Sequence, residues 1–240
     1  MKNLFKILIL SLFLFSCESP TESKLESCDG VIDECGVCDG DNYVDEICGS
    51  CSVNLWGECY NIEETDSLNL SLSGINGEIP SKIENLINLT YLNLTGNNLI
   101  GEIPSEIGSL TNLEFLNLTS NELSGEIPSE IGNLISLEFL SLLSNELTGE
   151  IPLEIQNLIH LSQLRLSGNQ LTGEIPFGIF SLTNLIELWL YNNQLIGEIP
   201  IEICSQGYVS LSLYNNEFCP PYPECISQYN IDYQDTSNCP

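Results

Sequence analysis

The sequence predicts a repeat solenoid of the α/β type, in which short parallel strands stack on one face and cysteine-stapled caps close both ends. The tetrapeptide Gly-Glu-Ile-Pro occurs six times, each copy 24 residues after the last, beginning at Gly77. The string Leu-x-Leu-x-x-Asn opens seven segments, and only the first carries a serine, Ser73, in place of the asparagine. Cysteines are absent between Cys59 and Cys204 but frequent on either side. A fixed period of this length is typical of a chain whose coils contact only their neighbours.

The chain begins with a predicted export signal. Two lysines precede an apolar run over residues 7–15, which is too short to cross the ~30 Å hydrocarbon core of a membrane as a helix. The run ends in Leu-Phe-Ser-Cys, which resembles a bacterial lipobox and implies cleavage before Cys17 and lipidation of that cysteine. We therefore predict a signal peptide over residues 1–16 and a lipid-anchored tether over 17–27. The exported protein is then held at the cell surface or in the periplasm, or it is secreted.

The net charge narrows the classes of partner. The chain has 34 acidic and 5 basic residues, so its formal net charge is −29. Nucleic acids and anionic membranes attract proteins through lysine and arginine, so we exclude both as direct partners and expect membrane contact only through the lipid at Cys17. Cationic or neutral partners and divalent cations fit this charge better. The alternative is that the acidic residues only keep the protein soluble.

Residues 28–66 are predicted to form a cysteine- and aspartate-rich N-terminal module and cap. Its two Cys-x-x-Cys pairs would indicate zinc in a cytosolic protein. The export signal and the even number of cysteines favour disulfides instead, and the spacing leaves their pairing open. The cysteines assigned to these disulfides are Cys28, Cys35, Cys38, Cys48, Cys51 and Cys59.

The same module carries a cluster of carboxylates, for which a calcium site is one interpretation. Calcium takes six to eight oxygen ligands, which acidic side chains separated by glycines can supply. The other interpretation is a solvated acidic linker, because the EF-hand string is absent. No other cofactor is predicted. The candidate calcium ligands are Asp29, Asp33, Asp39, Asp41 and Asp45.

Each repeat opens with a predicted strand. Leu92 and Leu94 alternate with residues of other kinds, which places the leucines inside and their neighbours outside. The asparagine that follows, such as Asn97, is expected to bond to backbone groups of the next coil, so that the asparagines form a ladder. In Gly-Glu-Ile-Pro, the glycine permits an unusual backbone shape, the isoleucine points inward and the proline bends the coil. The glutamates of successive copies are expected to form a solvated row.

The repeat resembles the 24-residue, plant-type subclass of leucine-rich repeats, whose pattern is L-x-x-L-x-L-x-x-N-x-L-x-G-x-I-P. The resemblance covers residues 66–219, and we assign seven repeats to 67–218. It implies a right-handed superhelix with parallel strands on its concave face and 3-10 or irregular segments on its convex side. Trp56 and Gly57 are similar to the closing string of plant-type N-terminal caps, but Glu58 stands where an apolar residue is usual.

The periodicity ends in a predicted C-terminal cap over residues 204–240. Three prolines interrupt the repeat pattern there, and an even number of cysteines is expected to staple this end of the solenoid. Their pairing is left open by the sequence. The cysteines are Cys204, Cys219, Cys225 and Cys239.

No catalytic site is predicted. The single histidine, His160, lies ahead of a strand, where we expect an imidazole packed against its neighbours rather than a general base. The sequence contains neither a glycine-rich phosphate loop followed by lysine nor a nucleophile elbow. We therefore expect a non-enzymatic protein.

Function is expected at the outward-facing positions of the strands, which vary from repeat to repeat while the inward positions hardly change. Exposed aromatic and arginine side chains dominate interface energies, and Arg165 is expected to lie against Trp189 as a cation–π pair. The alternative is that the rings stack only to shield the sheet. The predicted ligand-binding residues are Tyr91, Phe115, Phe139, Arg165, Glu187, Trp189, Tyr191 and Tyr214.

The leading functional hypothesis is an exported, surface-anchored binding module that engages a protein or a polysaccharide on its concave face. The resemblance extends to inhibitors of cell-wall-degrading enzymes, but it predicts the fold of this chain and not its ligand. One alternative is a passive adhesion or spacer protein with calcium in the cysteine-rich module. Another is ice binding, suggested by outward columns of asparagine and threonine that break at Ser141 and Leu143. The oligomeric state is left open.

Overall fold

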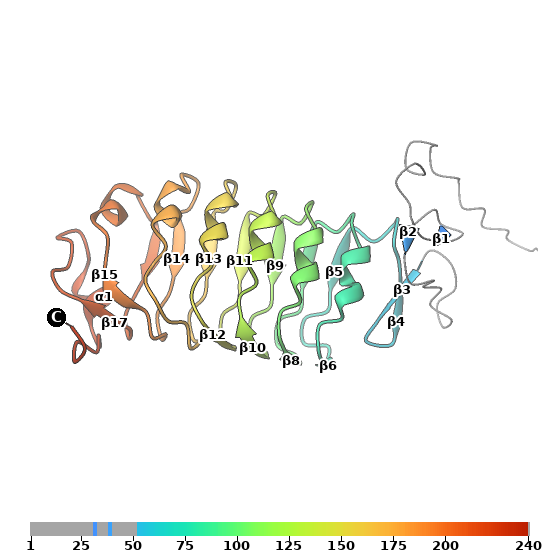
Figure 1. Cartoon of the computed structure of the whole chain (residues 1–240), viewed down its shortest axis with the longest axis horizontal. Coiled ribbons are helices and arrows are strands. Elements are labelled where there is room, and N and C mark those ends of the chain that lie inside the picture. Colours follow the sequence, from blue (N-terminus) through green and yellow to red (C-terminus); the bar gives the residue numbers. More distant parts are fainter. Residues whose placement is uncertain (1–30, 33–37, 40–51, 240) are drawn as a thin grey trace, which may run out of the picture. The chain divides into compact units, whose positions relative to one another are not determined.

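The computed structural model describes residues 31–32, 38–39 and 52–239, and the chain divides into two compact units, Met1–Cys51 and Ser52–Pro240 (Figure 1). In the first unit, β1 (Val31–Ile32) pairs with β2 (Cys38–Asp39) in an antiparallel ladder. The second unit contains all of the repeats.

Several predicted sites lie outside the described residues. These are the signal peptide, the lipidation site Cys17, the candidate calcium ligands and the first five disulfide cysteines, of which only Cys38 and Asp39 have a described backbone. Within the described part of the chain, no helix is long and apolar enough to cross a membrane.

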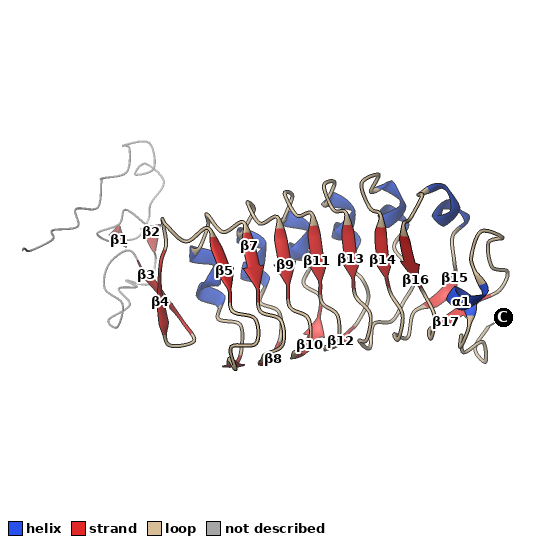
Figure 2. Cartoon of the chain, turned by 180° about the vertical axis from the view of Figure 1, so that it is seen from behind, coloured by secondary structure: helices blue, strands red, loops and turns tan. Residues whose placement is uncertain are grey.

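The repeats form one sheet of seven parallel strands, one strand per coil, which Figure 2 shows side by side. Leu92 lies opposite Leu68 on one side and Leu116 on the other, so the coils stack without a change of register. This arrangement confirms the predicted solenoid. The strands are β5 (Ser67–Asn69), β7 (Tyr91–Asn93), β9 (Phe115–Asn117), β11 (Phe139–Ser141), β13 (Gln163–Arg165), β14 (Glu187–Trp189) and β16 (Ser210–Ser212).

A second row of short parallel strands lies just before or at the start of most Gly-Glu-Ile-Pro copies, a feature that the sequence had not indicated. Four of these strands form one sheet, and β15 (Ile196–Glu198) pairs with β17 (Glu217–Cys219). The strands of the four-stranded sheet are β6 (Asn76–Gly77), β8 (Asn98–Gly101), β10 (Glu122–Glu126) and β12 (Glu146–Thr148).

Each proline of Gly-Glu-Ile-Pro stands directly before a one-turn 3-10 helix. Pro104, for example, has φ −67° and precedes η3, a position where a fixed φ suits the first turn and the missing N–H costs nothing. This confirms the predicted 3-10 segments on the side away from the main sheet. The helices are η2 (Ser81–Asn85), η3 (Ser105–Ser109), η4 (Ser129–Asn133), η5 (Leu153–Asn157), η6 (Phe177–Ser181) and η7 (Ile201–Ser205).

The buried asparagines form the predicted ladder, but each serves the coil before it and not the next one. Asn97 accepts hydrogen bonds at 3.1 Å from the N–H groups of Ser73 and Ile75, and its Nδ2 donates to the carbonyls of Leu70 and Leu94 at 2.8 and 2.9 Å. The direction follows from the sheet, since N–H groups at this level point toward the next coil. The same pattern recurs at Asn121, Asn145, Asn169, Asn193 and Asn216.

The glycine and the glutamate of Gly-Glu-Ile-Pro form a contact between coils. Gly149 has φ +74°, and a Cβ atom there would lie 2.8 Å from Cγ of Glu126 in the preceding coil. Equivalent contacts place Glu78 on Gly101 and Glu102 on Gly125. The glutamates are exposed, as predicted, yet their side-chain stems occupy the space that the following glycine leaves open.

We expect Gly149→Ala to lower the free energy of unfolding by about 2 kcal/mol, because the left-handed backbone and the contact with Glu126 both disfavour a side chain. The matched control is Gly74→Ala, where φ is +69° but nothing lies within 4 Å of the new Cβ. It should cost only the backbone part, about 1 kcal/mol. Urea denaturation of both variants measures the difference, and equal costs would show that the contact with Glu126 contributes nothing.

The C-terminal cap continues the ladder with residues outside the repeat. The N–H of Phe218 donates to Oε1 of Gln234 at 3.1 Å and Nε2 of Gln234 donates to the carbonyl of Leu213 at 3.0 Å, as Asn216 does for Leu195 and Leu190 one coil earlier. Asn230 in α1 (Gln228–Ile231) accepts a further hydrogen bond at 3.0 Å from the N–H of Leu213. Two disulfides close this end, Cys204–Cys225 and Cys219–Cys239. The prediction that cysteines staple this end is therefore confirmed, and the pairing that the sequence left open is now defined.

The N-terminal end of the second unit is an antiparallel hairpin of β3 (Ser52–Leu55) and β4 (Glu58–Asn61). Val53 and Leu55 are buried and join the core of the solenoid. Cys59 is disulfide-bonded. The hairpin thus covers the apolar interior that the first coil would otherwise expose.

Candidate binding surface

The outward face of the main sheet carries a continuous row of stacked side chains, which we call the aromatic strip. It begins on β7 and reaches the C-terminal cap through contacts between successive coils. Its members are Tyr91, Phe115, Phe139, Arg165, Trp189, Tyr191, Tyr214 and Tyr229.

The N-terminal part of the strip is a stack of three rings. The ring centres of Tyr91 and Phe115 are 4.4 Å apart, those of Phe115 and Phe139 are 4.3 Å apart, and the planes meet at 9° and 8°. The spacing matches the distance between neighbouring strands, so each ring stands above its own strand and covers the face of the next ring. All three rings are partly exposed and turn their edges outward.

Arg165 joins the N-terminal part of the strip to its C-terminal part. Its guanidinium carbon lies 5.0 Å from the ring centre of Phe139 and 4.4 Å from that of Trp189. Its Nε forms an ion pair with Glu187, and its Nη2 donates a 2.9 Å hydrogen bond to Gln163. The side chains of Arg165 and Glu187 are only 28% and 16% exposed. Arg165 is therefore held from four sides and bridges the strip.

The C-terminal part of the strip combines rings with hydroxyl groups. Tyr191 and Tyr214 stack with ring centres 4.8 Å apart, and Tyr229 adds a tilted ring 4.9 Å from Tyr214. Trp189 is fixed by a 2.8 Å hydrogen bond from its Nε1 to Oγ of Ser210. Burial raises the pKa of Tyr214 to about 12, and the neighbouring Tyr229 adds to the shift. The Tyr214 hydroxyl consequently keeps its proton at neutral pH and can donate a hydrogen bond.

The strip crosses the sheet obliquely. Phe115 and Phe139 are the first residues of their strands, whereas Arg165 and Trp189 are the last residues of theirs. Tyr191 and Tyr214 lie two residues beyond the ends of β14 and β16. The strip moves along the strand direction by one outward position between Phe139 and Arg165, and by one more between Trp189 and Tyr191. The sequence had indicated every member except Tyr229, which lies in the cap, outside the repeat pattern.

The described residues contain no arrangement that suggests catalysis or metal binding. His160 is exposed, so the expectation that it packs against its neighbours is wrong, because the turn before β13 turns it to solvent. Among the described residues, no three histidine, cysteine or acidic side chains gather in a way that could hold a metal ion. The predictions that the protein is not an enzyme and that calcium binds in the cysteine-rich module remain predictions.

Comparison with known proteins identifies the repeat. A family model for the leucine-rich repeat matches residues 88–110, 112–134 and 136–158, and a two-copy leucine-rich-repeat model matches 156–202. No curated protein matches the chain.

Plant receptors are among the similar solved structures. The leucine-rich-repeat ectodomain of the receptor kinase GASSHO1/SCHENGEN3 from Arabidopsis thaliana, in complex with CASPARIAN STRIP INTEGRITY FACTOR 2, matches with a TM-score of 0.70 and 36% identity over 72% of this chain. PEPR1–AtPEP1 matches with a TM-score of 0.64 and 40% identity over 66% of it. The plant peptide hormone receptor RGFR1 in complex with RGF2 matches with a TM-score of 0.60 and 36% identity over 62% of it. The chain spans between 21% and 24% of these three structures.

Proposed function

Because this chain is a leucine-rich-repeat protein of the plant-type subclass, we propose that it is a binding module whose aromatic strip engages an extended segment of a protein. The single observation that carries the proposal is the strip itself, a continuous oblique row of aromatic side chains and one arginine across six coils. Structures of similar ectodomains with bound partners support it, and one of them is a peptide hormone receptor.

The geometry of the rings favours a peptide over a polysaccharide. Sugars bind aromatic residues by lying on a ring face, but the faces of Phe115 are covered by Tyr91 and Phe139. The strip presents ring edges instead, which carry partial positive charge and attract carbonyl oxygens. The hydroxyls of Tyr191 and Tyr214 add hydrogen-bond donors to the same row. An extended backbone offers carbonyl oxygens at regular intervals and therefore fits this surface.

Stacking also lowers the cost of binding. The side chains of the strip are held by their neighbours and by the ion pair of Arg165 with Glu187 before any ligand arrives. Little conformational entropy is then lost on association, which is how a preorganised surface gains affinity. Self-stacking and ligand binding are therefore compatible explanations of the same rings.

The proposal includes export and a surface location. The two disulfides of the C-terminal cap fit an oxidising compartment, and extracellular ectodomains are among the similar structures. The lipid anchor at Cys17 and the spacer role with calcium in residues 28–66 stay predictions from the sequence.

We expect a displayed library of random peptides, selected on the full chain, to yield a consensus whose binding depends on the strip. The double substitution Trp189→Ala and Tyr191→Ala should weaken binding of the selected peptides by about 30-fold or more, since truncation of two central aromatic anchors costs at least about 2 kcal/mol in typical interfaces. Titration calorimetry with one selected peptide measures the change, and the unfolding midpoint shows whether the variant is folded.

The matched control is Tyr233→Ala, which removes a ring that is 83% exposed and lies outside the strip. It should leave the affinity unchanged within a factor of about two. If the double variant binds the selected peptide as tightly as the wild-type chain does, the binding site does not lie on the strip. If the peptide library gives no consensus and the chain binds specific polysaccharides on a glycan array, the ligand of the strip is a glycan and not a peptide.

A further inference from the structure

The N-terminal hairpin carries an unusual turn. Trp56 and Gly57 connect β3 to β4, with φ values of +51° and +90°. Two positive φ values suit the twist of a two-residue hairpin turn, but the first normally falls on asparagine, aspartate or glycine. A tryptophan there costs about 1–2 kcal/mol in backbone conformation. Its Nε1 donates a 3.0 Å hydrogen bond to the carbonyl of Glu78, which fixes the indole over the first coil.

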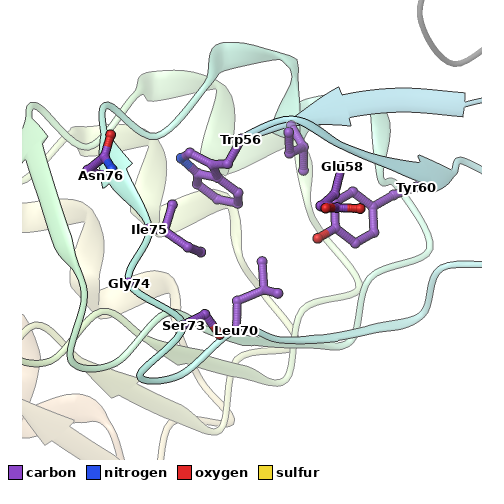
Figure 3. Close-up of a pocket in the computed structure, with 9 residues that line it drawn as sticks. Trp56, Glu58, Tyr60, Leu70, Ser73, Gly74, Ile75 and Asn76 are labelled. Atoms are coloured by element: carbon purple, nitrogen blue, oxygen red, sulfur yellow. The ribbon is translucent and has the colours of Figure 1, made fainter.

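A cavity of about 540 Å³ lies between this turn and the first coil (Figure 3). Trp56 and Tyr60 form aromatic walls, Leu70 and Ile75 contribute apolar surface, and Glu58 brings a carboxylate to the rim. Glu58 and Tyr60 are alternate residues of β4 and so point to the same side of the hairpin. The charge of Glu58 contributes to the raised pKa of Tyr60, after burial, which places the carboxylate close to the phenol.

Two departures from the repeat rules meet at this cavity. Glu58 replaces the apolar residue that is usual in such caps, and Ser73 replaces the ladder asparagine. An asparagine at position 73 would reach back toward the hairpin, as Asn97 reaches back to the carbonyl of Leu70. The shorter serine donates only to the carbonyl of Ser71 and leaves that space open. The residue that breaks the ladder therefore also lines the cavity, with a short side chain.

We propose that this cavity binds an alkylammonium group, of the kind carried by a lysine side chain. Two aromatic rings and one carboxylate around an apolar space are the chemistry that recognises such a cation, because its charge meets the ring faces and the carboxylate while its methylene chain contacts aliphatic side chains. Among the described residues, none forms a hydrogen bond or an ion pair with the exposed carboxylate of Glu58, so its charge is available. The net charge of −29 raises the local concentration of cations around the whole protein.

The cavity is separate from the aromatic strip, and the two sites can be tested independently. The chain has two tryptophans, Trp56 and Trp189. Trp189→Phe keeps a ring in the strip and leaves Trp56 as the sole indole, so fluorescence then reports on the cavity alone. In this background, n-butylammonium at 0.1 M salt should change the fluorescence of Trp56 with a saturable midpoint. Neutral 1-butanol should bind at least about fivefold more weakly, since it lacks the charge that the rings and carboxylate recognise.

A matched pair of charge substitutions separates the cavity from the general acidity of the protein. Glu58→Gln should raise the midpoint for n-butylammonium by about fivefold, whereas Glu102→Gln, which removes an equal charge from the exposed row, should leave it unchanged. Tyr60→Leu, which keeps the charge and removes the ring, should also weaken binding. Circular dichroism confirms that each variant is folded.

Three outcomes would overturn the proposal: no saturable change with n-butylammonium, equal effects of Glu58→Gln and Glu102→Gln, or equal binding of 1-butanol. A short peptide with one lysine distinguishes the source of the cation. Tighter binding of the peptide than of n-butylammonium supports a lysine of a partner protein, and equal binding supports a small amine as the ligand of the same site.

Discussion

Asn97→Ala is expected to lower the free energy of unfolding by about 3 kcal/mol or more. The substitution leaves two carbonyls and two N–H groups without their partner, namely those of Leu70, Leu94, Ser73 and Ile75. Each buried backbone group left unsatisfied costs about 1–3 kcal/mol. The bond to Leu94 is buried and cannot be replaced by solvent. A structural role of this size is unusual for an asparagine, because most asparagines in proteins are solvated.

The chain supplies its own control at the next position. Asn98 is exposed, and Asn98→Ala makes the same chemical change one residue away. It should alter the free energy of unfolding by less than about 0.5 kcal/mol. Urea denaturation of both variants gives the comparison. Similar small costs for the two substitutions would mean that solvent or a shift of the coil replaces the ladder bonds.

The repeat was predictable because its physical causes are local and recur. Leu92 and Leu94 alternate with outward residues, and six more copies of this pattern fix the register of the sheet. The direction of the asparagine ladder was not predictable in this way, since it depends on which backbone groups of each strand face the next coil. The role of Asn230 was hidden for another reason. It lies 17 residues after Leu213 and breaks the 24-residue period, so no periodic pattern could reveal it.

The residues of the candidate surface were predictable from the sequence, but the contacts that join them into one strip were not. The outward positions of the strands are enough to indicate the rings and Arg165 from the sequence. That Arg165 bridges Phe139 and Trp189 depends on the reach of a long side chain across two coils. Tyr229 was missed because it comes from the cap and enters the strip only through tertiary contact with Tyr214. Similarly, Glu58 was visible as a departure from the cap pattern, but the cavity beside it is a property of the fold.

Removal of the two C-terminal disulfides is expected to destabilise the end of the solenoid by about 3 kcal/mol for each bridge. Cys204–Cys225 and Cys219–Cys239 close loops with sequence separations of 21 and 20 residues. In the chain-entropy model, loops of about this length contribute about 3 kcal/mol by restricting the unfolded state. The cap contains little regular helix besides, since its α-helix is a single turn, Gln228–Ile231. The buried core there depends on Phe218, which is fully inaccessible to solvent.

The loss should be local, because each coil of a solenoid contacts only its neighbours and can open without the rest. Hydrogen exchange followed by mass spectrometry compares the oxidised chain with the quadruple cysteine-to-serine variant. Amides after Ile199 should exchange faster in the variant, while amides between Leu92 and Leu142 should keep their rates. Uniform acceleration along the chain would show that the repeats unfold as one cooperative unit, and unchanged rates in the cap would show that packing around Phe218 and the bonds of Asn230 suffice. The expected gradient follows from the ladder, since the bonds of Gln234 with Phe218 and Leu213 are the last ones, and the coils before them keep their own asparagines.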